Sequence, residues 1–86
     1  MKVLLTAIAM IVTVASSASA MPSCERMWHE RNSVFAKAGY CFKTAQAIRV
    51  FGNAGCAYDD EYELPLSQKD REYINEIKRA ERLFCR

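Results

Sequence analysis

Four cysteines are the residues of this chain whose type and spacing carry the clearest chemical meaning. Cys24, Cys41, Cys56 and Cys85 are separated by 17, 15 and 29 positions. Structural zinc sites usually contain closely spaced CxxC pairs, and this sequence has none. The even number of cysteines instead predicts two disulfides, for which three connectivities are open. We expect Cys41 to pair with Cys56, which closes a short loop of the chain. We expect Cys24 to pair with Cys85, which joins the two ends of the domain.

The other potential acids, bases and nucleophiles form no catalytic pattern. His29 is the only histidine, and it follows Trp28 in a segment of helical periodicity, where a lone histidine is normally a surface or packing residue. A cysteine nucleophile needs a free thiolate, which paired cysteines do not supply. The acidic residues at positions 59–63 lack the D-x-D-x-D-G spacing of a calcium loop. We therefore predict no enzymatic activity, no metal site and no cofactor.

Residues 1–20 have the layout of a secretory signal peptide. Lys2 gives a positive start, residues 3–15 are uncharged and apolar, and positions 18–20 read Ala-Ser-Ala, as before a cleavage site. The apolar stretch is shorter than the roughly 20 residues that cross a bilayer. We predict cleavage after position 20, a periplasmic or secreted location, and no membrane span in the mature protein.

The lipoprotein alternative is weaker. It would place the lipid on Cys24, but Pro22 stands where a lipidation motif has a small flexible residue. Lipidation would also leave three cysteines, an odd number for disulfide pairing.

Cleavage leaves residues 21–86 as one small domain. A chain of this size buries only about 60% of the surface that its unfolded form exposes, so its core alone is marginal. Disulfides persist in an oxidising compartment, and the two expected here contribute roughly 3 and roughly 4 kcal/mol on the chain-entropy model. Without Lys2 the domain has eleven basic and ten acidic residues. This near-neutral balance demands no nucleic-acid partner.

Apolar residues at helical spacing predict three helices. The first begins at the N-cap Ser23 and stops at Gly39, a residue suited to the left-handed conformation after a helix end. The second runs from the N-cap Thr44 to about Phe51, and the third from Ser67 to the C-terminal cysteine. The apolar positions expected to face the core are Trp28, Phe35, Ala38, Ala47, Ile48, Phe51, Tyr73, Ile74, Ile77, Ala80 and Phe84. The predicted fold is all-α, a small three-helix domain clipped by two disulfides.

A long loop separates the second and third predicted helices. We call residues 53–65 the acidic loop, because Asp59, Asp60, Glu61 and Glu63 crowd it. Its Gly55, its charges and its terminal proline argue against regular structure. Its two tyrosines are the aromatic residues expected to face solvent. The predicted ligand or partner surface comprises Trp28, Arg31, Tyr58, Asp59, Asp60 and Tyr62.

The Arg31-Asn32 pair has a structural and a functional interpretation. In the structural one, Asn32 faces inward and bonds the backbone of the following turn or loop, because an unpaired buried amide costs about 1–3 kcal/mol. Arg31 then pairs with an acid of the acidic loop. In the functional one, Arg31, Trp28 and Tyr58 line a groove for a sugar or peptide. The aromatic rings would stack on the ligand, and the guanidinium would form an ion pair with a carboxylate. We favour the structural interpretation.

The segment RNSVFAKAGYCFKT, residues 31–44, resembles the core of the YARHG domain, a small bacterial extracytoplasmic module. The Tyr-Ala-Arg-His-Gly of that family corresponds to residues 35–39, with Arg31-Asn32 before it and an aromatic residue after it. The family's arginine is Lys37 here and its histidine is Ala38, so any chemistry of that histidine is absent. Further matching positions are Tyr40, Phe42, Lys43, Phe51, Ala57, Tyr58, Leu66, Ser67, Ile74, Ile77 and Glu81.

The resemblance implies a binding or accessory role, because YARHG domains occur beside extracellular peptidase and kinase-associated regions in bacterial envelope proteins. We predict an exported non-enzymatic binding or accessory module of the cell envelope, whose partner is a peptidoglycan fragment or an envelope protein. The alternative is a small secreted inhibitor or effector that acts on a protein.

Overall fold

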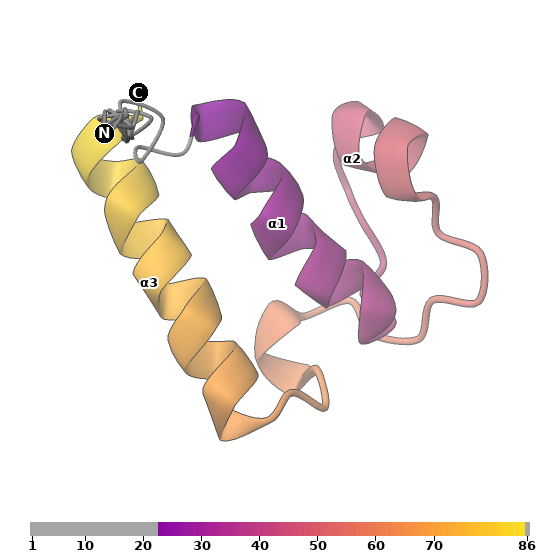
Figure 1. Ribbon diagram of the computed structural model, residues 1–86. Helices are drawn as coiled ribbons and strands as arrows, with labels where there is room; N and C mark the ends of the chain where they lie inside the picture. Colours follow the sequence, from indigo (N-terminus) through magenta and orange to yellow (C-terminus); the bar gives the residue numbers. More distant parts are fainter. Residues whose placement is uncertain (1–22, 86) are drawn as a thin grey trace, which may run out of the picture.

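The computed structural model describes residues 23–85, and the predicted signal peptide lies outside them. Three α-helices and one short 3-10 helix follow one another: α1 (Cys24–Lys37), α2 (Ala45–Phe51), η1 (Glu61–Glu63) and α3 (Gln68–Phe84). α1 and α3 lie side by side and run in opposite directions, and α2 lies on the other side of α1 (Figure 1). The described residues form no β-strand beyond an isolated bridge. The prediction of a three-helix all-α fold is confirmed.

Each helix begins where a local capping signal predicted it. Ser23, Thr44 and Ser67 each accept a hydrogen bond from the amide nitrogen three residues later, at 3.1, 3.2 and 3.0 Å. These bonds satisfy one of the unpaired donors at each helix start. α1 ends as predicted, because Gly39 adopts a positive φ of 93° directly after the C-cap Ala38.

The turn after α1 pairs with the middle of the acidic loop. The carbonyl of Gly39 accepts hydrogen bonds from the amides of Ala57 and Tyr58, at 2.8 and 3.1 Å, and the amide of Cys41 donates to the carbonyl of Tyr58 at 2.7 Å. The Tyr58 ring packs over Gly39, where an added Cβ would lie 3.5 Å from it. The expectation that Tyr58 faces solvent is therefore wrong, because backbone pairing draws it against the core.

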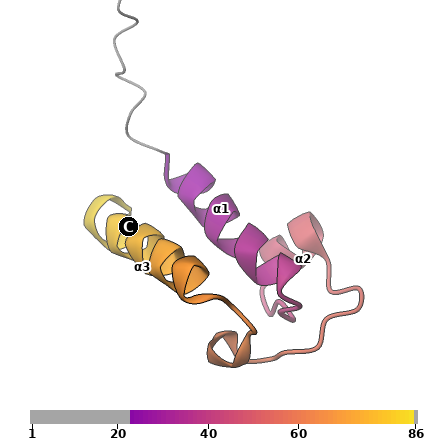
Figure 2. The ribbon, with the colours of Figure 1, turned by 60° about the horizontal axis from the view of Figure 1, so that its bottom comes forward.

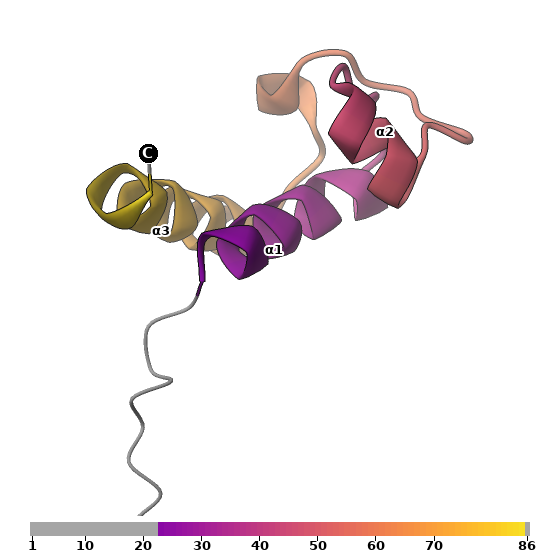
Figure 3. The ribbon, with the colours of Figure 1, turned by 90° about the horizontal axis from the view of Figure 1, so that it is seen from above.

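The core lies between the α1–α3 pair and the segments that cover it. Figure 3 shows α2 and η1 on the same side of that pair, and Figure 2 shows the acidic loop running from α2 round to η1. The buried cluster consists of Phe35, Phe42, Ala47, Leu64 and Ile74. Leu64, in the acidic loop, is only 1% exposed. The absence of regular structure predicted for this loop is also wrong, since it contains η1.

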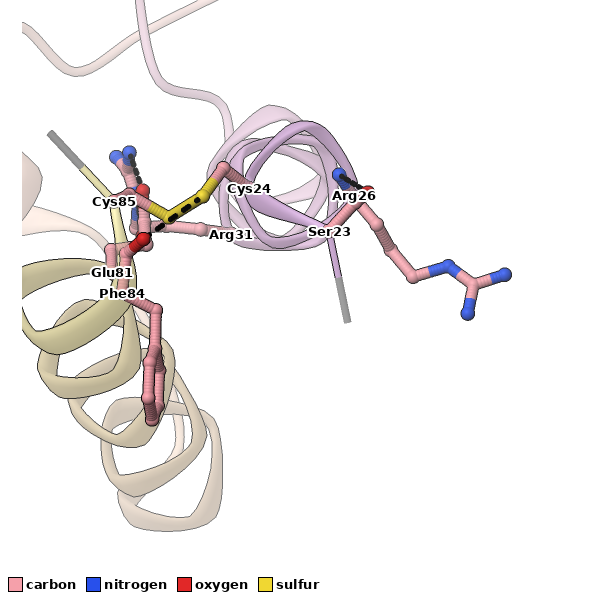
Figure 4. The surroundings of a disulfide bond; sticks show 7 residues. All are labelled: Ser23, Cys24, Arg26, Arg31, Glu81, Phe84 and Cys85. Atoms are coloured by element: carbon pink, nitrogen blue, oxygen red, sulfur yellow. Dashed lines mark hydrogen bonds and ion pairs between the residues drawn. A yellow bond between two sulfur atoms is a disulfide. The ribbon is translucent and has the colours of Figure 1, made fainter. Parts of the chain in front are cut away.

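Three residues predicted to face the core are instead exposed. Ile48, Tyr73 and Phe84 have exposed fractions of 42%, 40% and 60%. The short α2 buries only Ala47, so no further layer of residues covers Ile48. Phe84 lies in the last turn of α3, and its ring points away from α1 (Figure 4).

Both disulfides have the predicted connectivity. Cys24 and Cys85 join the start of α1 to the end of α3, with their Cα atoms 5.8 Å apart (Figure 4). Cys41 and Cys56 close the segment that contains α2, with a Cα separation of 5.1 Å. Both separations lie in the ordinary range for disulfides.

Candidate functional site

The predicted ligand surface does not form a single site. Trp28 and Arg31 lie on α1 and line a hollow of about 290 Å³. Tyr58 does not line it, so the groove that was to combine these three side chains is absent from the described structure. Lys43 and Glu61 are the other charged residues at this hollow.

Arg31 serves to join two helices. Its Nε donates to Oε1 of Glu81 at 2.7 Å, and its Nη2 donates to Oε2 at 3.0 Å (Figure 4). The predicted partner, an acid of the acidic loop, is therefore wrong. Glu81 is favoured because the antiparallel packing of α1 and α3 places it opposite Arg31, where both carboxylate oxygens can be reached. This two-pronged pair supports the structural interpretation of Arg31.

Asn32 faces inward as predicted but bonds a different group. It is 6% exposed, and its Nδ2 donates to the carbonyl of Trp28 at 2.9 Å, one turn earlier in α1. The predicted bond to the following turn or loop is not formed. A short amide on a helix readily reaches the carbonyl four residues before it, which satisfies the buried donor locally.

Two of the four acidic side chains of the acidic loop, those of Asp60 and Glu61, have structural partners. Asp60 accepts a hydrogen bond from the amide of Tyr62 at 2.9 Å and so caps η1. Glu61 pairs with Lys78 of α3 at 2.6 Å. Asp59 is exposed, and its backbone carbonyl accepts a hydrogen bond from Lys43. Within residues 23–85 no three His, Cys, Asp or Glu side chains gather in a way that could hold a metal ion.

A second hollow lies between η1 and the middle of α3. We call it the α3 cleft, and its volume is about 230 Å³. Phe35, Leu66 and Ile74 form its apolar part. Its polar lining consists of Glu61, Tyr62, Arg71, Asn75 and Lys78.

Lys78 lies at the centre of the polar part of this cleft. Its Nζ is 2.6 Å from Oε1 of Glu61, 5.9 Å from the centroid of the Phe35 ring and 5.8 Å from that of Tyr62. An ammonium group at such distances from aromatic faces is attracted by their quadrupoles. Arg71 donates from Nη2 to the carbonyl of Leu64 at 2.7 Å. The α3 cleft therefore contains two cations and one acid, beside an apolar wall.

Sequence reasoning found Tyr62 but missed the rest of the α3 cleft. Tyr62 is 76% exposed, as expected of the acidic loop. Arg71, Asn75 and Lys78 were not singled out, although their spacing of four and three residues places them on one face of α3. Ile74 lies among them in the sequence, so an apolar and a basic stripe meet along this helix.

The fold and its hollows define a small, disulfide-linked, all-α domain with a mixed apolar and cationic surface cleft. The family model of the YARHG domain matches residues 1–82 of the 86-residue chain. The chain therefore belongs to the YARHG domain family, as its sequence motif predicted. No curated protein and no solved structure matches it.

Family membership is consistent with an extracellular or envelope accessory module. The two disulfides agree with an extracellular environment, where such bonds persist. No helix among residues 23–85 is long and apolar enough to cross a membrane.

Proposed function

We propose that this chain is an exported, non-enzymatic binding module of the bacterial cell envelope. The observation that carries the proposal is the α3 cleft, which combines an apolar wall with charged groups and the exposed Tyr62. Concave sites with an apolar lining and a few placed polar groups are typical of ligand recognition. Its acid, Glu61, is already paired with Lys78, which suits a role in binding more than in proton transfer.

The rigidity of the scaffold also supports a binding role. Cys41–Cys56 fixes the acidic loop near the corner after α1, and Cys24–Cys85 fixes the far end of the α1–α3 pair. A surface held in its bound conformation before binding loses less entropy when a partner arrives. The leading partner is a peptidoglycan fragment or a protein of the envelope.

Retention on purified sacculi tests the glycan version. The mature domain should sediment with sacculi at low salt, and Tyr62→Ser should reduce the bound fraction several-fold. Val50→Ser is the matched control, because Val50 is 48% exposed on α2 and does not line the α3 cleft. Absence of retention at low salt would remove peptidoglycan as the partner and leave an envelope protein.

The second candidate function is a secreted inhibitor or effector. It is favoured by Tyr62, which projects with 76% exposure from a loop fixed by a disulfide and by η1. Inhibition of isolated cell-wall hydrolases, lost in Tyr62→Ser and kept in Val50→Ser, would support it. Binding to sacculi without any effect on hydrolases would decide for the envelope module.

A further inference from the structure

We propose that the α3 cleft binds the carboxyl-terminal residue of a peptide. The apolar side chain of that residue would lie on Phe35 and Ile74, and its carboxylate on Lys78. This inference rests on the proposed binding function and names the chemistry of the ligand.

The size of the cleft limits the occupant to about one residue. Its volume of about 230 Å³ lies below the roughly 300–1,000 Å³ of typical small-molecule sites. Three of its lining side chains, Phe35, Leu66 and Ile74, are apolar and form part of the core or pack against it. A single aliphatic or aromatic side chain is therefore the best match for the apolar part.

The charges of the cleft favour an anion beside that apolar group. Arg71 and Lys78 line it, and Glu61 is the one acid that does so. An ammonium carries three donors and a guanidinium five. The described contacts use Lys78 for Glu61 and the Nη2 of Arg71 for the Leu64 carbonyl, which leaves donors for a carboxylate.

Glu61 acts as an internal competitor for the same ammonium group. The Glu61 and Lys78 side chains are 27% and 28% exposed, so water can solvate both when they separate. Ion pairs of this accessibility contribute little and exchange readily. A ligand carboxylate would take the place of the Glu61 carboxylate on Lys78, while Tyr62, next in the chain, covers the edge of the cleft.

The competition predicts opposite effects of two substitutions on one site. Lys78→Gln should weaken peptide binding roughly tenfold, the value of one charge-assisted hydrogen bond. Glu61→Gln should tighten it several-fold, because the competitor is removed. Lys69→Gln is the matched control, since Lys69 is an exposed cation in the first turn of α3 that does not line the cleft.

The probes are tetrapeptides labelled at the amino terminus that end in leucine or phenylalanine, each with a free carboxylate or as its amide. Fluorescence anisotropy with the mature, oxidised domain should show saturable binding of the free acids and roughly tenfold weaker binding of the amides. Equal binding of acids and amides, no binding of either, or weaker binding to Glu61→Gln would overturn the inference. Because Glu61→Gln is expected to gain affinity, misfolding cannot imitate the result. Sacculus or hydrolase binding without peptide binding would refute this inference and leave the proposed function standing. Absence of all three would also remove peptidoglycan and hydrolases as partners and restrict the proposed function to an envelope protein.

Discussion

The Arg31–Glu81 pair is the clearest single contact between α1 and α3. Each side chain is about one-fifth exposed, 21% for Arg31 and 19% for Glu81, and two hydrogen bonds connect them. Arg31→Lys loses the two-pronged geometry that only a guanidinium provides. We expect Arg31→Lys and Glu81→Gln each to lower the free energy of unfolding by about 1–2 kcal/mol.

A double-mutant cycle with urea unfolding measures this contact directly. The coupling energy should be about 1 kcal/mol. The control is Glu72→Gln, which removes the charge of an exposed acceptor, 3.2 Å from Gln68, and keeps an oxygen that can accept the same hydrogen bond. It should change the free energy of unfolding by less than about 0.5 kcal/mol. A coupling energy near zero for Arg31 and Glu81 would mean that packing and the nearby disulfide alone hold the helices together.

The environment of Tyr73 predicts that the stability of the fold depends on pH in the alkaline range. The Tyr73 hydroxyl donates to Oε2 of Glu30 at 2.8 Å, and this bond, with smaller effects of desolvation and of the Glu30 charge, raises the pKa of Tyr73 above its ordinary value. The bond exists only with the protonated phenol. Its contribution to stability is therefore full below the unfolded pKa of about 10 and is lost as the pH rises through the raised pKa.

Unfolding of wild type and of Tyr73→Phe at several alkaline pH values checks this sign. The stability difference between them should shrink as the pH passes about 10. Glu30→Gln removes the carboxylate and should abolish most of that trend. A difference that stays constant or grows with pH would contradict the assignment.

Residue roles could be predicted from the sequence where the partner is local. Ser23, Thr44 and Ser67 cap helices because each needs only the amide three residues later. The partner of Arg31 could not be predicted, because the sequence does not give the register of α1 against α3. The acids of the loop and Glu81 were therefore equally available as partners. Lys78 was missed for the same reason, since its partner, Glu61, is 17 positions away.

At the scale of elements, one amide closes the segment that carries α2. Asn53 accepts a hydrogen bond from the amide of Phe42 at 2.7 Å and donates one to the carbonyl of Phe42 at 2.9 Å. The Asn53 side chain thus pairs with both backbone polar groups of Phe42, as a neighbouring backbone segment would. Phe42 is only 5% exposed. Asn53→Ala leaves both groups unpaired, so we expect a loss of about 2 kcal/mol in the free energy of unfolding.

Asn53→Asp sharpens this test, because a carboxylate accepts from the amide but cannot donate to the carbonyl. It should also destabilise the domain at neutral pH. Asn75→Ala, an exposed asparagine of α3, is the control and should change the free energy of unfolding by less than about 0.5 kcal/mol. If Asn53→Ala matched this control, the disulfide beside the turn would be sufficient to close the segment.

The three α-helices were predictable and the folded path of the acidic loop was not. Helical periodicity, caps and Gly39 are local signals, and they located α1, α2 and α3. Leu64 lies between a glutamate and a proline, so its neighbours indicate an exposed loop. It becomes buried because it joins one cluster with Phe35 of α1 and Ile74 of α3, a consequence of packing at long range.

The whole molecule depends on two disulfides that act at opposite ends. Cys24–Cys85 joins positions 61 residues apart, and Cys41–Cys56 joins positions 15 apart. On the chain-entropy model the longer closed loop gives the larger effect. We expect the double alanine variants to lose about 4 and about 3 kcal/mol of unfolding free energy, respectively.

The two double alanine variants should differ more in which part of the structure changes than in how much unfolding free energy they lose. Cys24–Cys85 lies at the end of the α1–α3 pair away from η1 (Figure 1), whereas the α3 cleft draws on Arg71 to Lys78 in the middle of α3. Loss of Cys24–Cys85 should therefore shift amide resonances at the helix ends and leave those of the cleft in place. Loss of Cys41–Cys56 removes the support beside the Tyr58 pairing, so the part of the acidic loop that leads to η1 loosens and the resonances of Glu61 and Tyr62 should shift. The reverse pattern would mean that the cleft is held from the helix ends, and that its shape depends on the α1–α3 packing instead of on the corner after Gly39.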